Sequence, residues 1–197
     1  MRDRSVLEIG AAAGVPSIVS AICGASVVVM TDYPDPDLVG NMRFNAELAA
    51  GLIRKKSSSL LVEGYKWGEA VGPLLDHLPA ADSEARRKFD TLIMADVVYS
   101  HREHPSLIKT MHMTLKRAPE SVALVIFTPY QPWLLPKTER FFPLAEENGF
   151  QVTKIFETVM DEVLFENDPG VCCLWNPEGG RGLTATGRAI EKNGVWV

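Results

Sequence analysis

Cysteine is scarce in this chain of 197 residues, and the three that occur cannot form a disulfide framework. Cys23 stands alone, whereas Cys172 and Cys173 are adjacent, a spacing that fits neither paired disulfides nor a zinc site. Long apolar runs are also missing, since no stretch reaches the roughly 18 residues that a membrane-spanning helix needs. The first apolar segment is interrupted by Glu8 and Pro16 and reads poorly as a signal peptide. We therefore expect a cytoplasmic protein without a membrane partner.

An excess of basic residues is absent as well. Lysine and arginine total 20 against 25 aspartates and glutamates, which gives a formal net charge of −5, and the basic residues are scattered. Proteins that bind duplex nucleic acid normally carry a basic footprint, so we expect no nucleic-acid partner. Hydrophobic residues make up 46% of the chain, which is enough to bury a core in one domain. We expect this domain to be a monomer.

Short apolar runs alternate with helical patterns along the chain, which is typical of a parallel α/β sheet. Strands are expected at Ser5–Ile9, Ala25–Asp32, Ser59–Gly64, Phe89–Asp96, Ser121–Pro129 and Phe150–Thr158. Helices are expected at Gly14–Cys23, Leu38–Ile53, Gly72–Leu78, Glu103–Leu115 and Lys137–Asn148. This order predicts a Rossmann-like, doubly wound, mostly parallel sheet that binds ligands beyond the carboxyl ends of its strands. Residues 1–176 are expected to form the domain and residues 177–197 a poorly ordered tail.

The segment VLEIGAAAGVPS, from Val6 to Ser17, places an acid in the first expected strand and small residues in the turn after it. Such a turn lets a ligand approach the backbone closely. A dinucleotide site requires G-x-G-x-x-G, and here alanines separate Gly10 from Gly14, so that fingerprint fails. S-adenosylmethionine has no phosphate and carries an ammonium group, which a carboxylate at Glu8 can hold through charge-assisted hydrogen bonds. The alternative for Glu8 is a structural carboxylate that touches no ligand.

Two further residues fit the nucleoside part of such a cofactor. Asp32 ends the second expected strand, 22 positions after Gly10, where an acid can bind both ribose hydroxyls. Its alternative role is an Asx-turn before Pro34. Trp67, in the segment GYKWGE after the third expected strand, is placed to stack on the adenine ring. Its alternative role is that of an ordinary half-buried aromatic residue.

The fourth expected strand ends in a D-x-x-Y pattern formed by Asp96 and Tyr99. Ala95 is small enough to let the cofactor approach, and Asp96 can accept a hydrogen bond from a substrate amine. Methyl transfer from a sulfonium is an in-line displacement, so the enzyme mostly positions a neutral nucleophile. We therefore assign Asp96 and Tyr99 to catalysis, where they orient the lone pair of the amine and relay its proton to water. The alternative for Asp96 is a helix N-cap.

The segment HREH raises the question of a metal site. It places His101 and His104 three positions apart, whereas the zinc motif H-E-x-x-H places its histidines four apart on a helix. No third ligand is evident in the sequence. A polar rim near the active site is therefore favoured over a metal site.

The segments LEIGAAAGVPS, VVMTDYPDPDLVGNMRFN, GYKWG and ADVVYSHREH support a family resemblance over roughly Ser5 to Gly170. With them the chain resembles the class I S-adenosylmethionine-dependent methyltransferases of the lysine methyltransferase family, and more narrowly its fungal nicotinamide N-methyltransferase-like members. The resemblance implies S-adenosyl-L-methionine as cofactor, and elongation factor 1-alpha, methylated at its N-terminal glycine and adjacent lysine, as protein substrate. It places Asp96 and Tyr99 near the substrate amine. The cofactor-binding positions that it implies are Gly10, Ala11, Ala12, Asp32, Trp67 and Ala95.

The resemblance is incomplete at both ends. Family members carry a segment before the first strand, with an aromatic residue that helps close the cofactor pocket, and a last strand after FENDPG. This chain has four residues before its first expected strand and continues as VCCLWNPEGGRGLTATGR. We therefore expect the fold to lack the N-terminal lid and the last edge strand. Two other functions stay open: methylation of a small-molecule amine such as nicotinamide, and a non-catalytic remnant of the fold that serves as a binding module.

Overall fold

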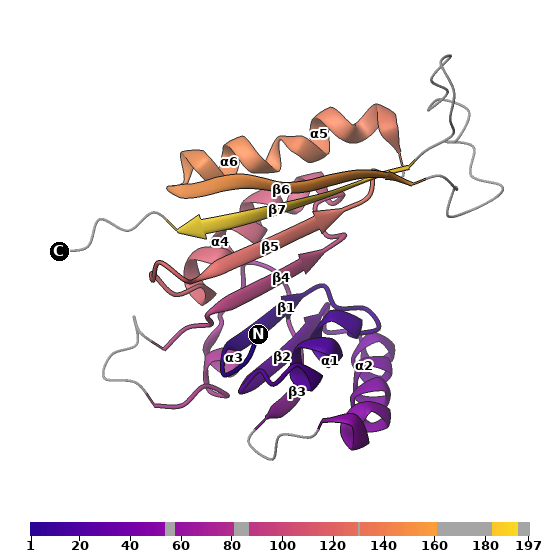
Figure 1. Cartoon of the computed structure of the whole chain (residues 1–197), viewed down its shortest axis with the longest axis vertical. Helices are drawn as coiled ribbons and strands as arrows, with labels where there is room; N and C mark the ends of the chain where they lie inside the picture. Colours follow the sequence, from indigo (N-terminus) through magenta and orange to yellow (C-terminus); the bar gives the residue numbers. More distant parts are fainter. Residues whose placement is uncertain (54–57, 81–86, 130, 161–182, 193–197) are drawn as a thin grey trace.

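The computed structural model describes residues 1–53, 58–80, 87–129, 131–160 and 183–192, and it contains a seven-stranded sheet (Figure 1). The strand order is β3-β2-β1-β4-β5-β7-β6, in which β7 is antiparallel to both neighbours and the other pairs are parallel. The prediction of a Rossmann-like, mostly parallel α/β sheet is confirmed. The strands are β1 (Ser5–Ile9), β2 (Val27–Asp32), β3 (Ser59–Gly64), β4 (Thr91–Ala95), β5 (Val122–Phe127), β6 (Phe150–Met160) and β7 (Leu183–Lys192).

The central strands β1, β2 and β4 are buried on both faces. Every residue of β1 is buried, as are the first five residues of β2 and the first four of β4. Leu7 of β1 lies opposite Val29 of β2 and Leu92 of β4, so apolar side chains of three strands form one row. Continuous apolar runs suit strands that are covered on both sides. The carboxyl ends of these strands are thereby held in fixed positions.

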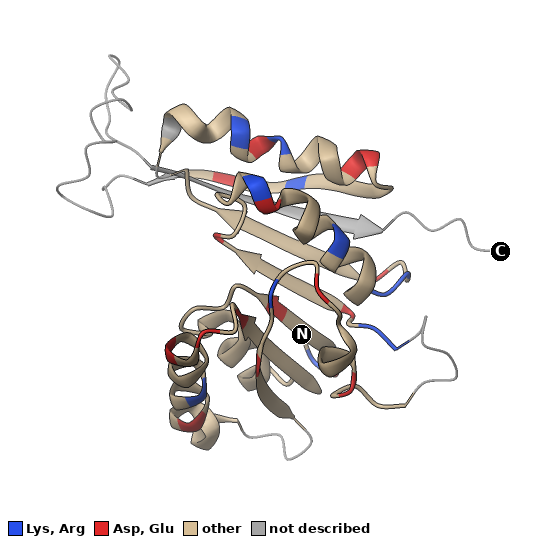
Figure 2. Cartoon of the chain, turned by 180° about the vertical axis from the view of Figure 1, so that it is seen from behind, with Lys and Arg blue, Asp and Glu red and all other residues tan. Residues whose placement is uncertain are grey.

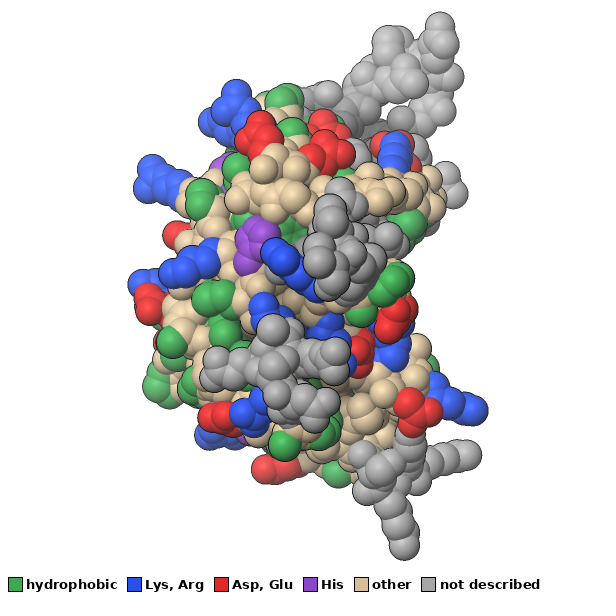
Figure 3. All heavy atoms as spheres, turned by 90° about the vertical axis from the view of Figure 1, so that its left-hand side faces the viewer, with side chains coloured by type: hydrophobic (Ala, Val, Ile, Leu, Met, Phe, Trp, Pro, Cys, Tyr) green, Lys and Arg blue, Asp and Glu red, His purple; other side chains and the backbone are tan. Residues whose placement is uncertain are grey.

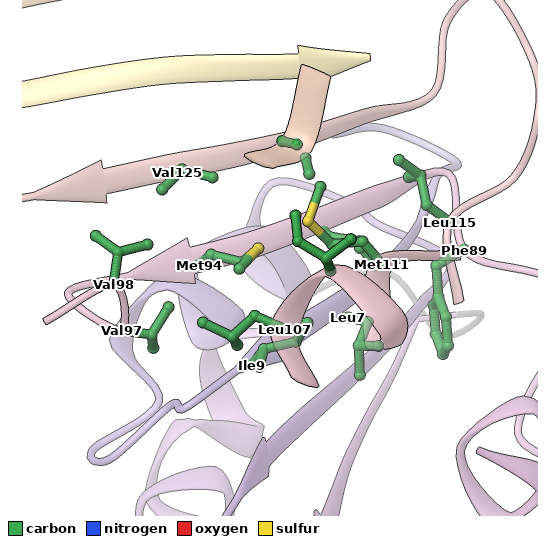
Figure 4. Packing of buried hydrophobic residues seen from close by; sticks show 14 of the residues in the cluster. Leu7, Ile9, Phe89, Met94, Val97, Val98, Leu107, Met111, Leu115 and Val125 are labelled. Atoms are coloured by element: carbon green, nitrogen blue, oxygen red, sulfur yellow. The ribbon is translucent and has the colours of Figure 1, made fainter. Parts of the chain in front are cut away.

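Helices cover both faces of the sheet. On one face, Ala21 of α1 and Met42 of α2 are buried against the strands, and on the other Leu107 and Met111 of α4 are buried beside Leu7. Figure 4 shows Leu107 and Met111 close to side chains of the central strands. The helical segments are α1 (Val15–Ile22), α2 (Pro36–Ala49), η1 (Ala50–Leu52), α3 (Gly72–Leu75), η2 (His101–Glu103), α4 (His104–Thr114), η3 (Pro132–Leu134), α5 (Leu135–Glu139) and α6 (Phe141–Glu147).

Local sequence signals explain where the longer helices begin. A proline stands in the first turn of α1, α2 and α4, where the missing N–H costs no helical hydrogen bond. Asp35 caps α2, because its Oδ1 accepts the backbone N–H groups of Asp37 and Leu38 at 2.9 and 3.3 Å. Helix α1 has Gly14 at its N-cap and therefore no capping side chain of its own.

The amino ends of β1 and β4 are tied together by Asp90. Its Oδ2 accepts the backbone N–H and the hydroxyl of Ser5, both at 2.8 Å, and Lys116 forms an ion pair with its Oδ1. Arg4 adds a hydrogen bond to the carbonyl oxygen of Asp90 at 2.9 Å. Burial raises the pKa of Asp90, but the bonds from Lys116 and Ser5 outweigh it and the net pKa is lowered. Figure 3 views the molecule from the side on which the amino ends of the parallel strands lie, and there basic and acidic side chains lie among hydrophobic ones.

Charged side chains lie mainly on helices and loops, while the strands are largely uncharged (Figure 2). Along the helices, basic and acidic residues alternate rather than separate into blocks of one sign. Within the part of the chain that the structure describes, no helix combines the length and apolar character needed to cross a bilayer.

Strand β7 corrects the prediction for the end of the chain. The sequence pattern predicts a poorly ordered tail from residue 177 and no last strand, and this prediction is wrong for residues 183–192. The backbone of β7 pairs with both neighbours, so that Ala189 lies opposite Leu124 of β5 and Thr153 of β6. A strand held by backbone hydrogen bonds on both sides needs no regular apolar alternation, which is the signal that prediction relies on. The expected boundary at residue 176 and the two adjacent cysteines lie outside the described residues.

Candidate active site

Two neighbouring cavities lie at the carboxyl edge of the parallel strands. The larger, of about 520 Å³, falls within the usual range of small-molecule sites. The smaller has a volume of about 210 Å³. Asp96 and Tyr99 line both cavities and mark the place where they meet. The predicted residues that line the larger cavity are Gly10, Ala12, Asp32, Trp67, Ala95, Asp96 and Tyr99.

Two predicted residues, Glu8 and Ala11, are buried and do not line the cavity. The Oε2 atom of Glu8 accepts the backbone N–H of Ser17 in the first turn of α1 at 2.9 Å. It therefore supplies the cap that Gly14 cannot provide. Burial raises the pKa of Glu8 to about 7, although the hydrogen bonds from Ser17 oppose the shift. Glu8 thus makes a contact of the kind that its structural alternative requires, and this contact holds the first turn of α1.

The glycines of the turn are required by both conformation and space. Gly10 and Gly14 adopt positive φ angles of 72° and 76°. A Cβ atom on Gly10 would lie 2.5 Å from Cγ1 of Val97 and 3.3 Å from the indole of Trp67. One on Gly14 would lie 2.6 Å from the sulfur of Met30. Close packing of the site's own side chains thus explains these glycines without reference to a ligand.

The turn is held in place from β2 and α2. Oδ2 of Asp32 accepts the backbone N–H of Ala12 at 2.7 Å, and its Oδ1 accepts that of Tyr33 at 2.7 Å. The amide of Asn45 donates to the carbonyl oxygen of Ala13 at 3.0 Å. A carboxylate has about four lone-pair positions, so each oxygen of Asp32 keeps capacity for a further donor. Asp32 therefore both shapes the turn and offers acceptors to the cavity.

The segment GYKWG is anchored to helix α4. The hydroxyl groups of Tyr65 and Thr110 are 3.1 Å apart, and the backbone N–H of Gly68 donates to the Thr110 hydroxyl at 2.9 Å. Burial raises the pKa of Tyr65, so its hydroxyl stays protonated and available for these contacts. These bonds hold Trp67, which is half-buried and packs against the core beneath the cavity. The indole thereby forms a fixed wall.

Asp96 occupies a strained position directly after β4. It has a positive φ of 51°, which is uncommon for a residue other than glycine and which aspartate tolerates better than most. Its Oδ1 accepts the backbone N–H of Thr128 at 2.8 Å, a bond that links the ends of β4 and β5. Asp96 does not cap the next helical segment, whose N-cap is Ser100. The carboxylate is exposed between the two cavities.

The residues after Asp96 continue the wall of the site. Tyr99 is 71% exposed, so its ring stands at the mouth of both cavities. His104 is buried and its Nε2 donates to the carbonyl oxygen of Val98 at 2.8 Å. His101 lines the smaller cavity, and its Nε2 lies 3.0 Å from the hydroxyl oxygen of Thr138. Each imidazole of the HREH segment thus has a partner within the protein.

Several residues of the larger cavity are not predicted by the sequence patterns. Tyr33 and Tyr65 directly follow β2 and β3, and Val97 lies two positions after the end of β4, so the rule that ligands bind at strand ends could have identified them. Lys66 and Leu38 of α2 join them through the path of the loops and helices, which sequence periodicity does not reveal. Glu103 of η2 also lines the cavity and belongs to the HREH segment, for which the sequence favours a polar rim near the active site.

Comparison with known proteins gives consistent results. Residues 1–143 match a family model described as lysine methyltransferase. The chain is 69% identical over 170 residues to protein N-terminal and lysine N-methyltransferase efm7 of Aspergillus fumigatus, covering 86% of this chain. It is 67% identical over 169 residues to the protein of the same name from Emericella nidulans, covering 85% of this chain. The chain spans 64% of the length of both relatives.

A solved structure shares the fold. It is that of a SAM-dependent methyltransferase from Aquifex aeolicus, with a TM-score of 0.58 and 14% sequence identity. The similarity covers 95% of this chain and 82% of that one. At this level of identity it supports the fold and does not bear on the substrate.

Proposed function

Because the chain belongs to the lysine methyltransferase family, we propose that it is an S-adenosylmethionine-dependent N-methyltransferase that acts on a protein amine. The observation that carries the proposal is the pair of cavities that meet at Asp96 and Tyr99. The proposed substrate is elongation factor 1-alpha, at its N-terminal amine and a nearby lysine, in line with the names of the two fungal relatives as N-terminal and lysine methyltransferases. Acting as a monomer on a translation factor, it would work in the cytoplasm.

The larger cavity fits S-adenosylmethionine in both size and chemistry. Small residues at Ala12 and Ala95 leave room beside the backbone, and Asp32 offers carboxylate oxygens to the ribose hydroxyls. The fixed indole of Trp67 offers an aromatic face to the adenine. When bound, the cofactor supplies an electrophilic methyl group on a positively charged sulfur. Binding of this sulfonium is also favoured by the carboxylates of Asp96 and Glu103 along the wall.

The chain's own task is to present a neutral amine in line with that methyl group. An α-amine has an ordinary pKa near 8, so about half of it is neutral at that pH, whereas a lysine amine has a pKa near 10.4 and is almost wholly protonated. Asp96 and Tyr99 stand where the cavities meet, so we assign them the hydrogen bonds that orient the nitrogen lone pair.

Replacing Asp32 with alanine is expected to weaken binding of S-adenosylhomocysteine by about 5- to 150-fold. The ribose hydroxyls and the Ala12 N–H lose their hydrogen-bond acceptor, and leaving such donors unpaired costs about 1–3 kcal/mol. Isothermal titration calorimetry measures the change. Asp35→Ala is the matched control, since Asp35 also accepts two backbone N–H groups but does not line the cavity. Equal losses of affinity in both variants would contradict the assignment.

Replacing Asp96 with asparagine is expected to lower kcat by roughly 100-fold and to change cofactor affinity little. Asparagine retains an oxygen for the Thr128 N–H, so the link between β4 and β5 is preserved. Steady-state kinetics and calorimetry on the same preparation separate the two quantities. A parallel loss of turnover and affinity would show that Asp96 is structural instead.

The decisive experiment has two stages. Titration with S-adenosylhomocysteine comes first, and the absence of binding heat at millimolar ligand would favour a non-catalytic fold. Radiolabelled cofactor is then offered with elongation factor 1-alpha and, separately, with nicotinamide. Label on the translation factor supports the proposal, whereas label on nicotinamide alone would replace it with a small-molecule methyltransferase.

A further inference from the structure

Resting on the proposed function, we propose that the smaller cavity receives the acceptor amine and that His101 takes the proton which the amine must lose. The cavity lies beside the larger one and shares Asp96 and Tyr99 with it, so a group placed here meets the larger cavity at these two residues. Its volume of about 210 Å³ suits a slim chain such as the first residue of a peptide or a lysine side chain.

Apart from the carboxylate of Asp96 at the junction, the lining of the smaller cavity favours the neutral form of an amine. Phe127, Pro129 and Leu134 are apolar, and the further polar residues Thr128, Gln131 and Thr138 are uncharged. An apolar environment disfavours an ammonium ion, so an amine that enters tends to lose its proton. The proton then requires an acceptor within the cavity.

His101 is the residue best suited to take that proton. The other titratable side chains that line the cavity are Asp96 and Tyr99. A carboxylate is a weak base near neutral pH and a phenol already carries its proton, whereas a neutral imidazole both accepts and releases a proton there. The imidazole of His101 is fixed by its contact with Thr138 of α5 at 3.0 Å and by the edge-on ring of His104 at 5.6 Å.

The surroundings keep this imidazole neutral before the substrate arrives. Burial lowers the pKa of His101, and the positive charge of Lys137 on α5 lowers it further. His104 of α4, whose own pKa is lowered by burial, faces it from the other side. A neutral ring does not repel an incoming ammonium group and has a free lone pair for its proton.

The proton transfer is balanced within the site. The ammonium group gives one proton to the imidazole, which leaves a neutral amine with its lone pair and a positively charged imidazolium. An α-amine holds its proton about 30-fold more tightly than an ordinary imidazole, so the imidazolium is short-lived. Half-exposed at the cavity wall, His101 then returns the proton to solvent.

The first test observes binding and does not depend on turnover. The full chain is labelled in its histidines, saturated with S-adenosylhomocysteine, and titrated with a short synthetic peptide that begins Gly-Lys while imidazole signals are followed by NMR. The signal of His101 is expected to shift, and that of His77, which is paired with Glu63 at 2.7 Å outside both cavities, is expected to stay. An unmoved His101 signal at saturating peptide would overturn the proposal.

The second test compares His101→Asn with His77→Asn. Asparagine can still contact Thr138 but cannot take a proton, so kcat is expected to fall about 100-fold with KM within about threefold of the unchanged protein. Affinity for S-adenosylhomocysteine is expected to stay within twofold in both variants. If kcat of His101→Asn equals that of His77→Asn, the proposed role of His101 is overturned. The proposed function still stands in that case, because the unchanged chain methylates its substrate. Failure of the unchanged chain to bind S-adenosylhomocysteine overturns the proposed function as well.

Discussion

Replacing Gly10 with alanine is expected to lower the free energy of unfolding by about 2–5 kcal/mol. The positive φ of 72° costs a residue with a Cβ roughly 1–2 kcal/mol. The new methyl group would also lie 2.5 Å from Cγ1 of Val97, a stiff β-branched side chain that is 3% exposed, and overpacking of this kind costs about 1–3 kcal/mol. Because Val97 and Trp67 line the larger cavity, affinity for S-adenosylhomocysteine is expected to fall as well.

Urea denaturation and calorimetric titration measure the two effects of Gly10→Ala. Gly40→Ala is the matched control, because Gly40 lies inside helix α2 with no atom within 4 Å of an added Cβ. There alanine is expected to stabilise the protein by about 0.5–1 kcal/mol. A loss below 1 kcal/mol for Gly10→Ala would show that Val97 moves aside without cost.

Replacing Glu8 with glutamine is expected to make the protein more stable at pH 8 by roughly 3 kcal/mol and to have little effect near pH 4. Burial raises the pKa of Glu8 from 4.5 to about 7 in the folded protein, so the folded state favours the protonated form. Its contribution to stability is therefore fully present below about pH 4.5 and is lost as the pH rises through about 7. Glutamine stays neutral throughout and still offers an oxygen to the Ser17 N–H.

The measurement is the difference in unfolding free energy between Glu8→Gln and the unchanged chain at a series of pH values. Taking the difference removes the contributions of other titrating groups such as Asp90. The difference is expected to grow between pH 4.5 and 8. A difference that does not vary with pH would mean that Glu8 ionises in the folded state as readily as in the unfolded chain.

Strand positions were predictable where burial dictates composition. The predicted bounds of β1 and β3 match the structure because short apolar runs flanked by turn residues identify strands, whether fully buried as in β1 or partly buried as in β3. The predicted helix at Lys137–Asn148 is instead two helices, α5 and α6, that meet at Arg140. Pro143 explains the break, since its ring nitrogen cannot donate to the carbonyl oxygen of Glu139 as an unbroken helix requires.

The site was predictable where it follows the ends of strands. Asp32, Ala95 and Asp96 lie at such ends, so topology alone directs them to the cavity. The orientation of Glu8 was also encoded, because alternate residues of a strand share a face and Val6 packs beside Ala21 of α1. His101 and Glu103 lie in η2, within the segment for which the sequence favours a polar rim near the active site, but the cavity that each one lines depends on distant contacts such as that of His101 with Thr138, which local patterns do not contain.

The insertion of β7 between β5 and β6 has a consequence for synthesis on the ribosome. Strand β6 emerges before β7 yet has no direct pairing with the parallel strands, so it cannot join them until β7 arrives. During that interval the outer edge of β5 presents unpaired backbone groups, which are a template for association with other chains. Nascent chains stalled between β6 and β7 should therefore be the form of this protein most dependent on chaperones.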